Sequence, residues 1–360
     1  MRKNTFMKYA LLFSTAVFVL FVSFNCSNPT APKQNNPPDT TSSNFIWTVD
    51  TIGTEGSVLY DICIINDSLA YATGSIYLKD STGKSNLAHP YNLMRWNGRN
   101  WEYFTLRYFP PGSVGDSAYG PGTSVFANNS NDIWVSAVVP FHFDGSRWRA
   151  YYNTGAEAAN KIWESPNRKQ LYFVGNNGLI TYSPDQGSTW KKVETGTALP
   201  FQDIWGDGGQ VLAIASDRSV GARQLYSLHG NTATVVSDSG LYYVFGGLWF
   251  SANQKYYIAG DGVFFKSSLN QPAWYRYTLG EVASYYSDAI RGNGLNNIVI
   301  AGDFADISFY NGVRWREYKE LYSPIDKLRS VSIKGNTIVA VGTRTYNGIR
   351  YYGVVYVGRR

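Results

Sequence analysis

One polar position recurs at the start of seven apolar segments of the chain. It is occupied in turn by Asp61, Ser124, Lys161, Asp203, Gly247, Asp288 and Ser330. The residue before it also varies: Tyr60, Thr123, Asn160, Gln202, Gly246, Ser287 and Arg329. If the fold gathers these positions into a ring, their charged, amide and aromatic groups would suit a polar ligand. The alternative is that the aspartates only cap strand ends and bind water.

The other residues form no recognisable catalytic or metal-binding motif. The three histidines, His89, His142 and His229, have no metal-ligand spacing. Neither a Gly-x-Ser-x-Gly elbow nor a phosphate-binding loop nor a paired-cysteine motif occurs. We therefore expect a non-enzymatic protein that holds no metal and no cofactor.

Three complete units of similar design set the framework for these residues. They read "YDICIINDSLAYATG…YNLMRWNGRNWEYFTL", "NKIWESPNRKQLYFVGNNGLITYSPDQGSTWKKVET" and "SDAIRGNGLNNIVIAGDFADISFYNGVRWREYKE". Each predicts four short strands separated by turns of Asn, Asp and Gly. No segment shows a convincing helical period, so no long helix is expected.

The spacing of the units can be counted from a small residue that ends the second strand. It falls at Gly74, Ala137, Gly175, Ala215, Gly260, Gly302 and Gly342. The steps are 63, 38, 40, 45, 42 and 40 residues, and the long first step contains an insertion, "YLKDSTGKSNLAHPYN". Four strands in roughly 40–45 residues are typical of a β-propeller blade.

An aromatic residue opens the fourth strand of most units, at Trp101, Trp148, Trp190, Trp274 and Trp315. Between Trp190 and Trp274 lies one unit without it, where "TATVV" fills the place. A residue repeated in this way indicates packing between blades rather than one ligand site. The seventh unit ends after three strands, whereas the chain opens with "NFIWTVDTIG", an isolated strand of the fourth kind that contains Trp47.

These observations predict an all-β, seven-bladed propeller over residues 45–360, with four antiparallel strands per blade. The N-terminal strand would close the ring by joining the C-terminal blade, which also pairs strand edges that would otherwise be open. Six or eight blades are the alternative, because the enlarged first unit could hide another hairpin.

The segment "SPDQGSTW" resembles the Asp-box motif of some propellers. The resemblance implies a structural turn that begins at Ser183, in which Asp185 accepts backbone N–H bonds, Gly187 adopts a positive φ and Trp190 packs between blades. Sialidases share this motif, but they repeat it and need an arginine cluster with a Tyr–Glu pair. Arg329 with Tyr285 or Tyr286 and Glu281 is the nearest such set in this sequence.

The first 25 residues read as an export signal. Arg2, Lys3 and Lys8 precede the apolar run "ALLFSTAVFVLFVSF", which is shorter than the ~20 residues of a membrane-spanning helix. The segment "VSFNC" resembles a bacterial lipoprotein signal, with Ser23 and Asn25 departing from the usual pattern. The resemblance implies that Cys26 is acylated. Ordinary signal-peptidase cleavage and a transmembrane anchor are the alternatives.

Residues 26–44, rich in Pro, Asn, Ser and Thr, are expected to be a disordered tether. Ser27 after the cysteine favours the outer membrane and leaves its periplasmic or cell-surface face open. An acylated Cys26 leaves only Cys63, expected to be a buried, inert thiol. The formal charge of +6 falls to +3 without residues 1–25, and no basic run supports nucleic-acid binding.

The whole pattern resembles the degenerate-repeat propeller lipoproteins of Bacteroidetes-type bacteria, with units like "DIWG…YAVG…W". It also resembles Asp-box assembly factors in which a propeller chaperones another protein. The resemblance implies a lipid-anchored module of the cell envelope that binds or scaffolds a protein. Two alternatives are a glycan-binding module using Tyr242, Tyr243, Tyr285 and Tyr286, and a sialidase-type hydrolase.

Overall fold

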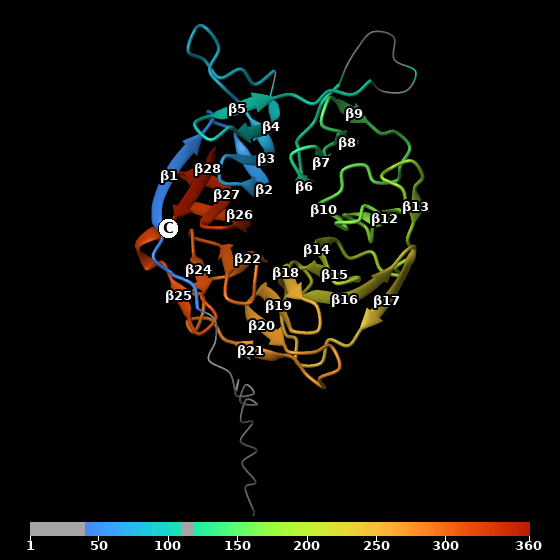
Figure 1. Ribbon diagram of the computed structural model, residues 1–360. Coiled ribbons are helices and arrows are strands. Elements are labelled where there is room, and N and C mark those ends of the chain that lie inside the picture. Colours follow the sequence, from blue (N-terminus) through green and yellow to red (C-terminus); the bar gives the residue numbers. More distant parts are fainter. Residues whose placement is uncertain (1–39, 89, 110–111, 113–117) are drawn as a thin grey trace, which may run out of the picture. The chain divides into compact units, whose positions relative to one another are not determined.

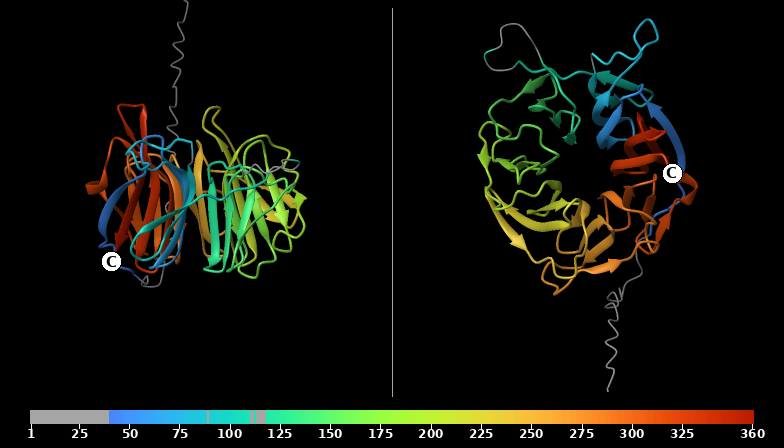
Figure 2. Two further views of the ribbon diagram at one scale, coloured as in Figure 1. Left: turned by 90° about the horizontal axis from the view of Figure 1, so that it is seen from above. Right: turned by 180° about the vertical axis from the view of Figure 1, so that it is seen from behind.

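A computed structural model describes residues 40–360, except 89, 110–111 and 113–117. The described residues form seven four-stranded antiparallel sheets arranged as blades around a central axis (Figure 1). Seen from the side, the strands run along that axis (Figure 2). The seven-bladed propeller predicted from the sequence is therefore confirmed, and the six- and eight-bladed alternatives are excluded.

Blades 1 to 3 follow in chain order, each from its innermost to its outermost strand. Blade 1 consists of β2 (Val58–Asn66), β3 (Leu69–Ile76), β4 (Tyr91–Trp96) and β5 (Trp101–Phe104). Blade 2 consists of β6 (Ser124–Asn129), β7 (Asp132–Ser136), β8 (Pro140–Phe143) and β9 (Trp148–Ala150). Blade 3 consists of β10 (Lys161–Glu164), β11 (Leu171–Val174), β12 (Ile180–Ser183) and β13 (Lys191–Lys192).

Blades 4 to 6 repeat this order. Blade 4 consists of β14 (Phe201–Asp207), β15 (Gln210–Asp217), β16 (Ala222–His229) and β17 (Thr232–Val236). Blade 5 consists of β18 (Phe245–Ser251), β19 (Lys255–Gly260), β20 (Gly262–Lys266) and β21 (Tyr275–Tyr277). Blade 6 consists of β22 (Ser287–Gly292), β23 (Ile298–Gly302), β24 (Ile307–Tyr310) and β25 (Trp315–Glu317).

Blade 7 contains strands from both ends of the described chain. Its inner strands are β26 (Asp326–Lys334), β27 (Thr337–Tyr346) and β28 (Arg350–Arg359), preceded by a short 3₁₀ helix, η1 (Lys319–Leu321). The outer strand is β1 (Ile46–Ile52), which pairs antiparallel with β28 from Ile46 opposite Arg359 to Ile52 opposite Gly353. The predicted ring closure is confirmed. Within the described residues, no helix is long and apolar enough to span a membrane.

The hydrophobic core lies between the blades. Seven clusters of buried side chains each join residues of two neighbouring blades, so every junction in the ring has its own cluster. Each repeated tryptophan packs at a different junction, as the repetition predicts: Trp47, Trp101, Trp148, Trp190, Trp274 and Trp315. At the remaining junction, between blades 3 and 4, Ala233 of the "TATVV" strand takes this place.

The last residues of the segment predicted to be a tether, residues 26–44, contact the propeller. Thr41 donates a backbone hydrogen bond to Asn311 O (3.2 Å), and its hydroxyl donates to Asn296 O (2.5 Å). The carbonyl oxygen of Ser43 accepts hydrogen bonds from the Tyr318 hydroxyl (2.8 Å) and from Arg316 (3.1 Å). Residues 41–44 are therefore held against blade 6 by backbone groups that composition does not reveal. Residues 1–39, with Cys26, lie outside the described residues.

Candidate functional site

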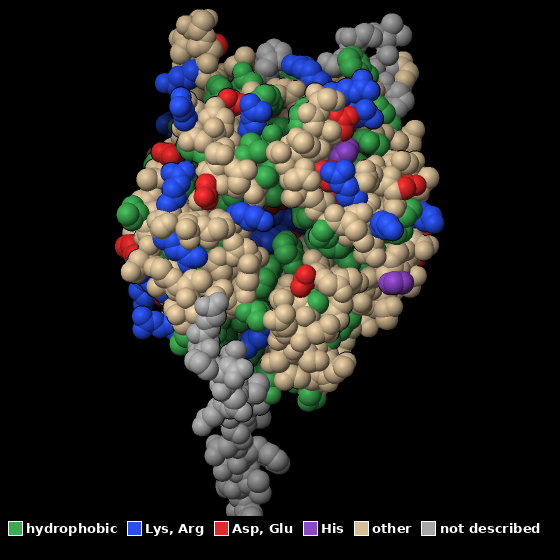
Figure 3. All heavy atoms as spheres, viewed as in Figure 1, with side chains coloured by type: hydrophobic (Ala, Val, Ile, Leu, Met, Phe, Trp, Pro, Cys, Tyr) green, Lys and Arg blue, Asp and Glu red, His purple; other side chains and the backbone are tan. Residues whose placement is uncertain are grey.

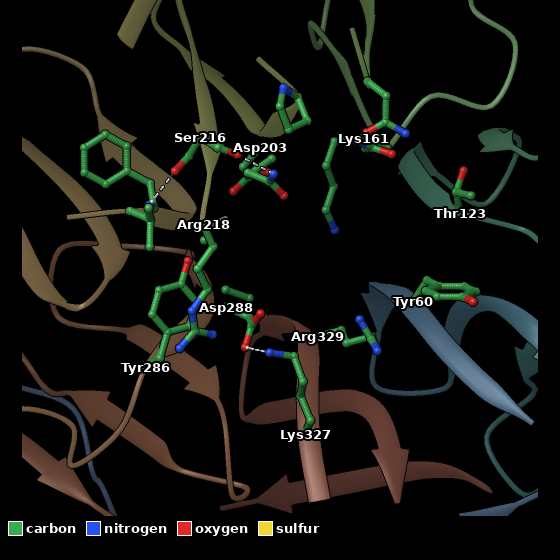
Figure 4. A pocket seen from close by; sticks show the side chains of 18 of the residues that line it. Tyr60, Thr123, Lys161, Asp203, Ser216, Arg218, Tyr286, Asp288, Lys327 and Arg329 are labelled. Carbon is green, nitrogen blue, oxygen red and sulfur yellow. Dashed lines mark hydrogen bonds and ion pairs between the residues drawn. The ribbon is translucent and has the colours of Figure 1, made fainter. Parts of the chain in front are cut away.

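A hollow of about 650 Å³ opens where the innermost strands begin. The nine residues predicted to bind a ligand are Tyr60, Asp61, Lys161, Gln202, Asp203, Tyr285, Tyr286, Asp288 and Arg329. All of them except Asp61 and Tyr285 line this hollow. They come from five blades, since each innermost strand enters the channel at this end, and Lys161, Tyr60 and Arg329 point into the shared space (Figure 4). We call this hollow the central pocket. The fold therefore brings residues of five blades together around one hollow.

Asp61 differs from the prediction because it supports the wall rather than lining it. It is 4% exposed and accepts hydrogen bonds from the hydroxyls of Ser124 and Ser330, both at 2.6 Å, on either side of blade 1. It also accepts the Val125 backbone N–H at 3.1 Å, and Lys161 Nζ of blade 3 lies 2.6 Å from its Oδ1. Burial by itself would raise the pKa of Asp61, but the Lys161 ammonium and these hydrogen bonds hold it below its usual value.

Tyr285 and Tyr286 also differ from the predicted arrangement. Tyr285 is not part of the pocket lining, and Tyr286 is 9% exposed, with the Arg218 guanidinium 4.4 Å from its ring centre. Both residues lie in the bend before β22, where Tyr285 packs against Phe304 and Tyr322 and Tyr286 is buried beside Arg218. Tyr286 therefore offers no open aromatic face for stacking on a sugar.

A second ion pair crosses the pocket floor. Arg291 of β22 places its terminal nitrogens 2.7 and 2.8 Å from the two carboxylate oxygens of Asp203 in β14. Asp203 also accepts the backbone N–H of Leu248 at 2.8 Å. Blade 5 lies between the two partners, and its corresponding position is Gly247, which has no side chain to interfere.

At the rim, Lys327 connects two acidic residues of blade 6. Its ammonium donates a hydrogen bond to Asp303 Oδ1 (2.7 Å) and forms an ion pair with Asp288 Oδ2 (3.0 Å; Figure 4). Arg218 approaches Asp303 more loosely, at 3.6 Å. Burial raises the pKa of Asp288 to about 6, with a further contribution from Asp303, and Lys327 only partly offsets it.

Arg329 differs from the other basic side chains of the central pocket because it has no ion-pair partner among the described residues. Within the described part of the chain, no carboxylate lies within salt-bridge distance of its guanidinium. Its Nε donates a 3.3 Å hydrogen bond to Thr343 Oγ1, and the guanidinium carbon lies 5.7 Å from the Tyr60 ring centre. Figure 3 shows Lys and Arg side chains at the central hollow, with hydrophobic side chains next to them.

An aromatic cluster stands beside this rim. Tyr285, Phe304 and Tyr322 contact one another with ring centres 4.6 to 6.1 Å apart, and Phe304 follows Asp303 directly. Phe304 and Ala305 both have positive φ values, 61° and 57°, an uncommon backbone for residues with side chains. The strained loop holds Phe304, 37% exposed, next to Tyr322, 50% exposed.

Two buried carboxylates, Asp132 and Glu164, belong to a closed cluster between blades 2 and 3. Asp132 Oδ1 lies 2.7 Å from His142 Nε2, and Asn128 donates a 2.5 Å hydrogen bond to Glu164. Both carboxylates are 1% exposed. Burial, followed by the charge of Asp132, raises the pKa of Glu164 to about 8. Because both carboxylates are closed off from solvent, a substrate has no access to this pair.

The sialidase-like set is not assembled either. Glu281 accepts hydrogen bonds from Thr278 and lines a separate surface hollow with Arg316 and Glu317, away from Arg329. Among the described residues, no three His, Cys, Asp or Glu side chains gather as a metal site would require. His89 lies outside the described residues.

The "SPDQGSTW" turn joins β12 to β13 with the expected contacts. Asp185 accepts the Thr189 backbone N–H and hydroxyl, both at 2.7 Å, and Ser183 Oγ accepts the Gly187 N–H at 2.8 Å. Gly187 has a φ of 82°, and a Cβ there would lie 2.8 Å from the Trp134 ring. Trp190 meets Trp134 of blade 2 edge-on. The turn therefore belongs to the framework of blades 2 and 3.

Cys63 lies half-buried in β2, with its Sγ 4.0 Å from Ala127 O. Burial raises the pKa of this thiol to about 11, so it is protonated at neutral pH. A protonated thiol is a poor nucleophile, which agrees with the unreactive role expected for Cys63.

The sequence reasoning missed three basic residues of the central pocket: Arg218, Arg291 and Lys327. Lys327 stands two residues before Arg329 on the same strand, so strand alternation could have revealed it. Arg291 lies three residues beyond Asp288, and a bulge between Ser287 and Ala289 shifts its strand register. Arg218 follows a second strand, and no pattern in the first strands points to it.

No protein-family model matches the chain, and no curated protein matches it in sequence. Solved structures are similar in fold. "YCF48 bound to D1 peptide" is 14% identical, with a TM-score of 0.63, and covers 91% of this chain and 100% of its own. YCF48 from Cyanidioschyzon merolae is 15% identical, with a TM-score of 0.59, and covers 87% and 98%. At this identity the likeness establishes the propeller fold alone.

Proposed function

We propose that this chain is a lipid-anchored, non-enzymatic propeller of the cell envelope that binds a partner protein. The anchor would be Cys26, after a signal peptide of residues 1–25, with the following residues as a tether toward the propeller. Outer-membrane placement is part of the proposal. It rests on the resemblance of "VSFNC" to lipoprotein signals and on the residue that follows the cysteine.

The observation that carries protein binding is the Tyr285–Phe304–Tyr322 cluster beside the central pocket. Exposed aromatic side chains next to charged groups are typical of the anchoring positions in protein interfaces. The loops between second and third strands and those entering the innermost strands meet at this end of the ring. We call this end the entry face. A structurally similar propeller, YCF48, binds a D1 peptide, which supports the same kind of use for this fold.

Photo-crosslinking in intact cells tests the proposal. A photoreactive phenylalanine would replace Tyr322 on the entry face or, as the matched control, Val313, which is 54% exposed in the β24–β25 hairpin at the other end of blade 6. We expect one recurrent protein adduct from position 322 and none from position 313. That protein, once purified, should bind the purified chain. Identical adducts from both positions, or none from position 322, would contradict the proposal.

Glycan binding is the second candidate, favoured by the exposure of Tyr242 (55%) and Tyr243 (54%) before β18. A broad glycan array probed with the purified protein separates the two functions. Selective sugar binding that is lost when both tyrosines become alanine would favour a lectin. Absence of binding at micromolar protein would favour the protein-binding function.

A further inference from the structure

We infer that the central pocket receives a carboxylate group from an acidic peptide segment of the partner, with Arg329 as the residue that binds it. This inference rests on the proposed protein-binding function and specifies its chemistry. Its evidence is the charge of the pocket, the free hydrogen-bonding capacity of one guanidinium and the aromatic cluster at the rim.

The central pocket carries more positive than negative groups. Five basic side chains line it, Lys161, Arg218, Arg291, Lys327 and Arg329, whereas two acidic side chains do, Asp203 and Asp288. Both aspartates already face a basic partner, at 2.7 Å in one pair and 3.0 Å in the other. Asp61 and Asp303, behind the lining, pair with Lys161 and Lys327, so one positive charge, that of Arg329, is left without a carboxylate among the described residues. Low-dielectric walls focus the remaining positive potential into the hollow, which favours an anion there.

Arg329 has the geometry to receive that anion. Its single hydrogen bond to the protein uses Nε and Thr343, so its two terminal nitrogens make no hydrogen bond within the described residues. Tyr60 lies against the guanidinium at 5.7 Å and limits its orientation. A planar guanidinium presents parallel N–H groups that match the two oxygens of a carboxylate. Lys161 points into the same space, but its ammonium is already paired with Asp61 at 2.6 Å (Figure 4).

The surroundings favour a carboxylate on a peptide over a free phosphate or a neutral sugar. A phosphate dianion would meet the carboxylates of Asp203, Asp288 and Asp303, whereas one carboxylate carries about half that charge. A volume of about 650 Å³ exceeds what a small anion fills and is typical of sites for larger ligands. The exposed Phe304 and Tyr322 give an apolar contact beside it, which a peptide can reach with neighbouring side chains.

Peptide selection on the full-length protein, purified in a mild detergent, tests this inference. A phage-displayed library of random 12-residue peptides would be selected on the wild-type chain and counter-selected on Arg329→Gln. The best peptides would then be synthesised with each acidic residue intact or replaced by its amide. We expect the enriched peptides to contain Asp or Glu next to apolar residues.

Affinity measurements then locate the contact. Removal of a charge-assisted hydrogen-bonded pair weakens binding by roughly tenfold or more, so we expect that loss in Arg329→Gln and also in the amide peptide. Arg99→Gln, in the exposed β4–β5 hairpin at the far end of blade 1, should bind like the wild type. Circular dichroism and thermal unfolding would show that each variant is folded. Millimolar acetate should compete better than equimolar inorganic phosphate.

The outcomes separate this inference from the proposed function. Enriched peptides without acidic residues, or with equal affinity for Arg329→Gln, would overturn the carboxylate site and leave protein binding intact. A library that yields no binder would also overturn the carboxylate site. Stronger competition by phosphate than by acetate would indicate a phosphate site in its place. Failure of the crosslink at position 322 despite acidic peptide binding would instead contradict the cellular function and retain the pocket chemistry.

Discussion

Arg291 of blade 6 reaches over blade 5 to form a two-point ion pair with Asp203 of blade 4. Gly246 and Gly247 make this possible, because a Cβ at either position would lie 2.5–2.7 Å from backbone atoms of blade 6. The same arrangement recurs where Lys161 of blade 3 reaches Asp61 of blade 1 past Ser124. Together with the looser Arg218–Asp303 pair between blades 4 and 6, three ion pairs among the described residues connect blades that are not neighbours in the ring.

The first prediction concerns the stability that this ion pair provides. Arg291→Met should lower the free energy of unfolding by about 3–5 kcal/mol, because it leaves the buried Asp203 carboxylate without its counter-charge. Adding Asp203→Asn, which keeps an acceptor for Leu248 N–H, should recover part of that loss. Urea unfolding of both single variants and the double variant measures the effect.

A surface pair serves as the matched control. Lys192 and Glu194 also lie within 2.9 Å, but their side chains are 71% and 79% exposed. Lys192→Met should therefore leave the urea midpoint unchanged. Equal losses in the Lys192 and Arg291 variants would show that the buried pair has no special role.

Ring closure by β1 gives the second prediction. Trp47 packs edge-on against Tyr318 of blade 6 with ring centres 5.1 Å apart, whereas Ile46 on the same strand is 80% exposed. Trp47→Ala should cost about 2–4 kcal/mol of unfolding free energy through the cavity it leaves at the blade 6–7 junction. Ile46→Ala should change stability little. Similar thermal midpoints for the two variants would contradict a closing role for Trp47.

Repetition explains how much of this molecule could be predicted. Because each blade must bury the same faces against its neighbours, the small residues, the tryptophans and the entry to the innermost strand recur at a steady period. That period revealed the seven blades and most of the central pocket. The unpaired state of Arg329 and the partners of Asp61 depend instead on contacts across the channel, between residues up to 269 positions apart. No local pattern encodes them.

The third prediction concerns the pH dependence of stability. The pKa of Glu164 is raised to about 8 in the folded state, so the folded chain holds this proton more tightly than the unfolded chain does. Its stabilising contribution is complete below the ordinary glutamic acid pKa near 4.5 and is lost as the pH rises to about 8. The loss should be on the order of a few kcal/mol.

Glu164→Gln should remove that part of the pH dependence. The amide can still accept from Asn128 and carries no charge next to Asp132, Arg168 and His142. We expect the variant to gain stability relative to the wild type between pH 5 and pH 8, in urea unfolding at constant salt. Parallel pH curves for the two proteins would refute a neutral Glu164. The comparison cancels contributions from Asp288 and Asp306, whose raised pKa values act in the same direction.

The last prediction connects pH to ligand binding in the central pocket. Asp288 has a pKa of about 6 and faces Lys327, Asp303, Arg329 and Tyr286. Below pH 6 it becomes neutral and stops competing for Lys327, while a ligand carboxylate with an ordinary pKa near 4 keeps its charge. An acidic peptide should therefore bind more tightly at pH 5.5 than at pH 7.5. Asp288→Asn should bind the peptide tightly at both pH values, with little change between them.

Fluorescence anisotropy with a labelled acidic peptide measures this affinity, and the amide form of the same peptide controls for general effects of pH. Weaker binding at pH 5.5, with no change in Asp288→Asn, would mean that Asp288 and the ligand do not share this site.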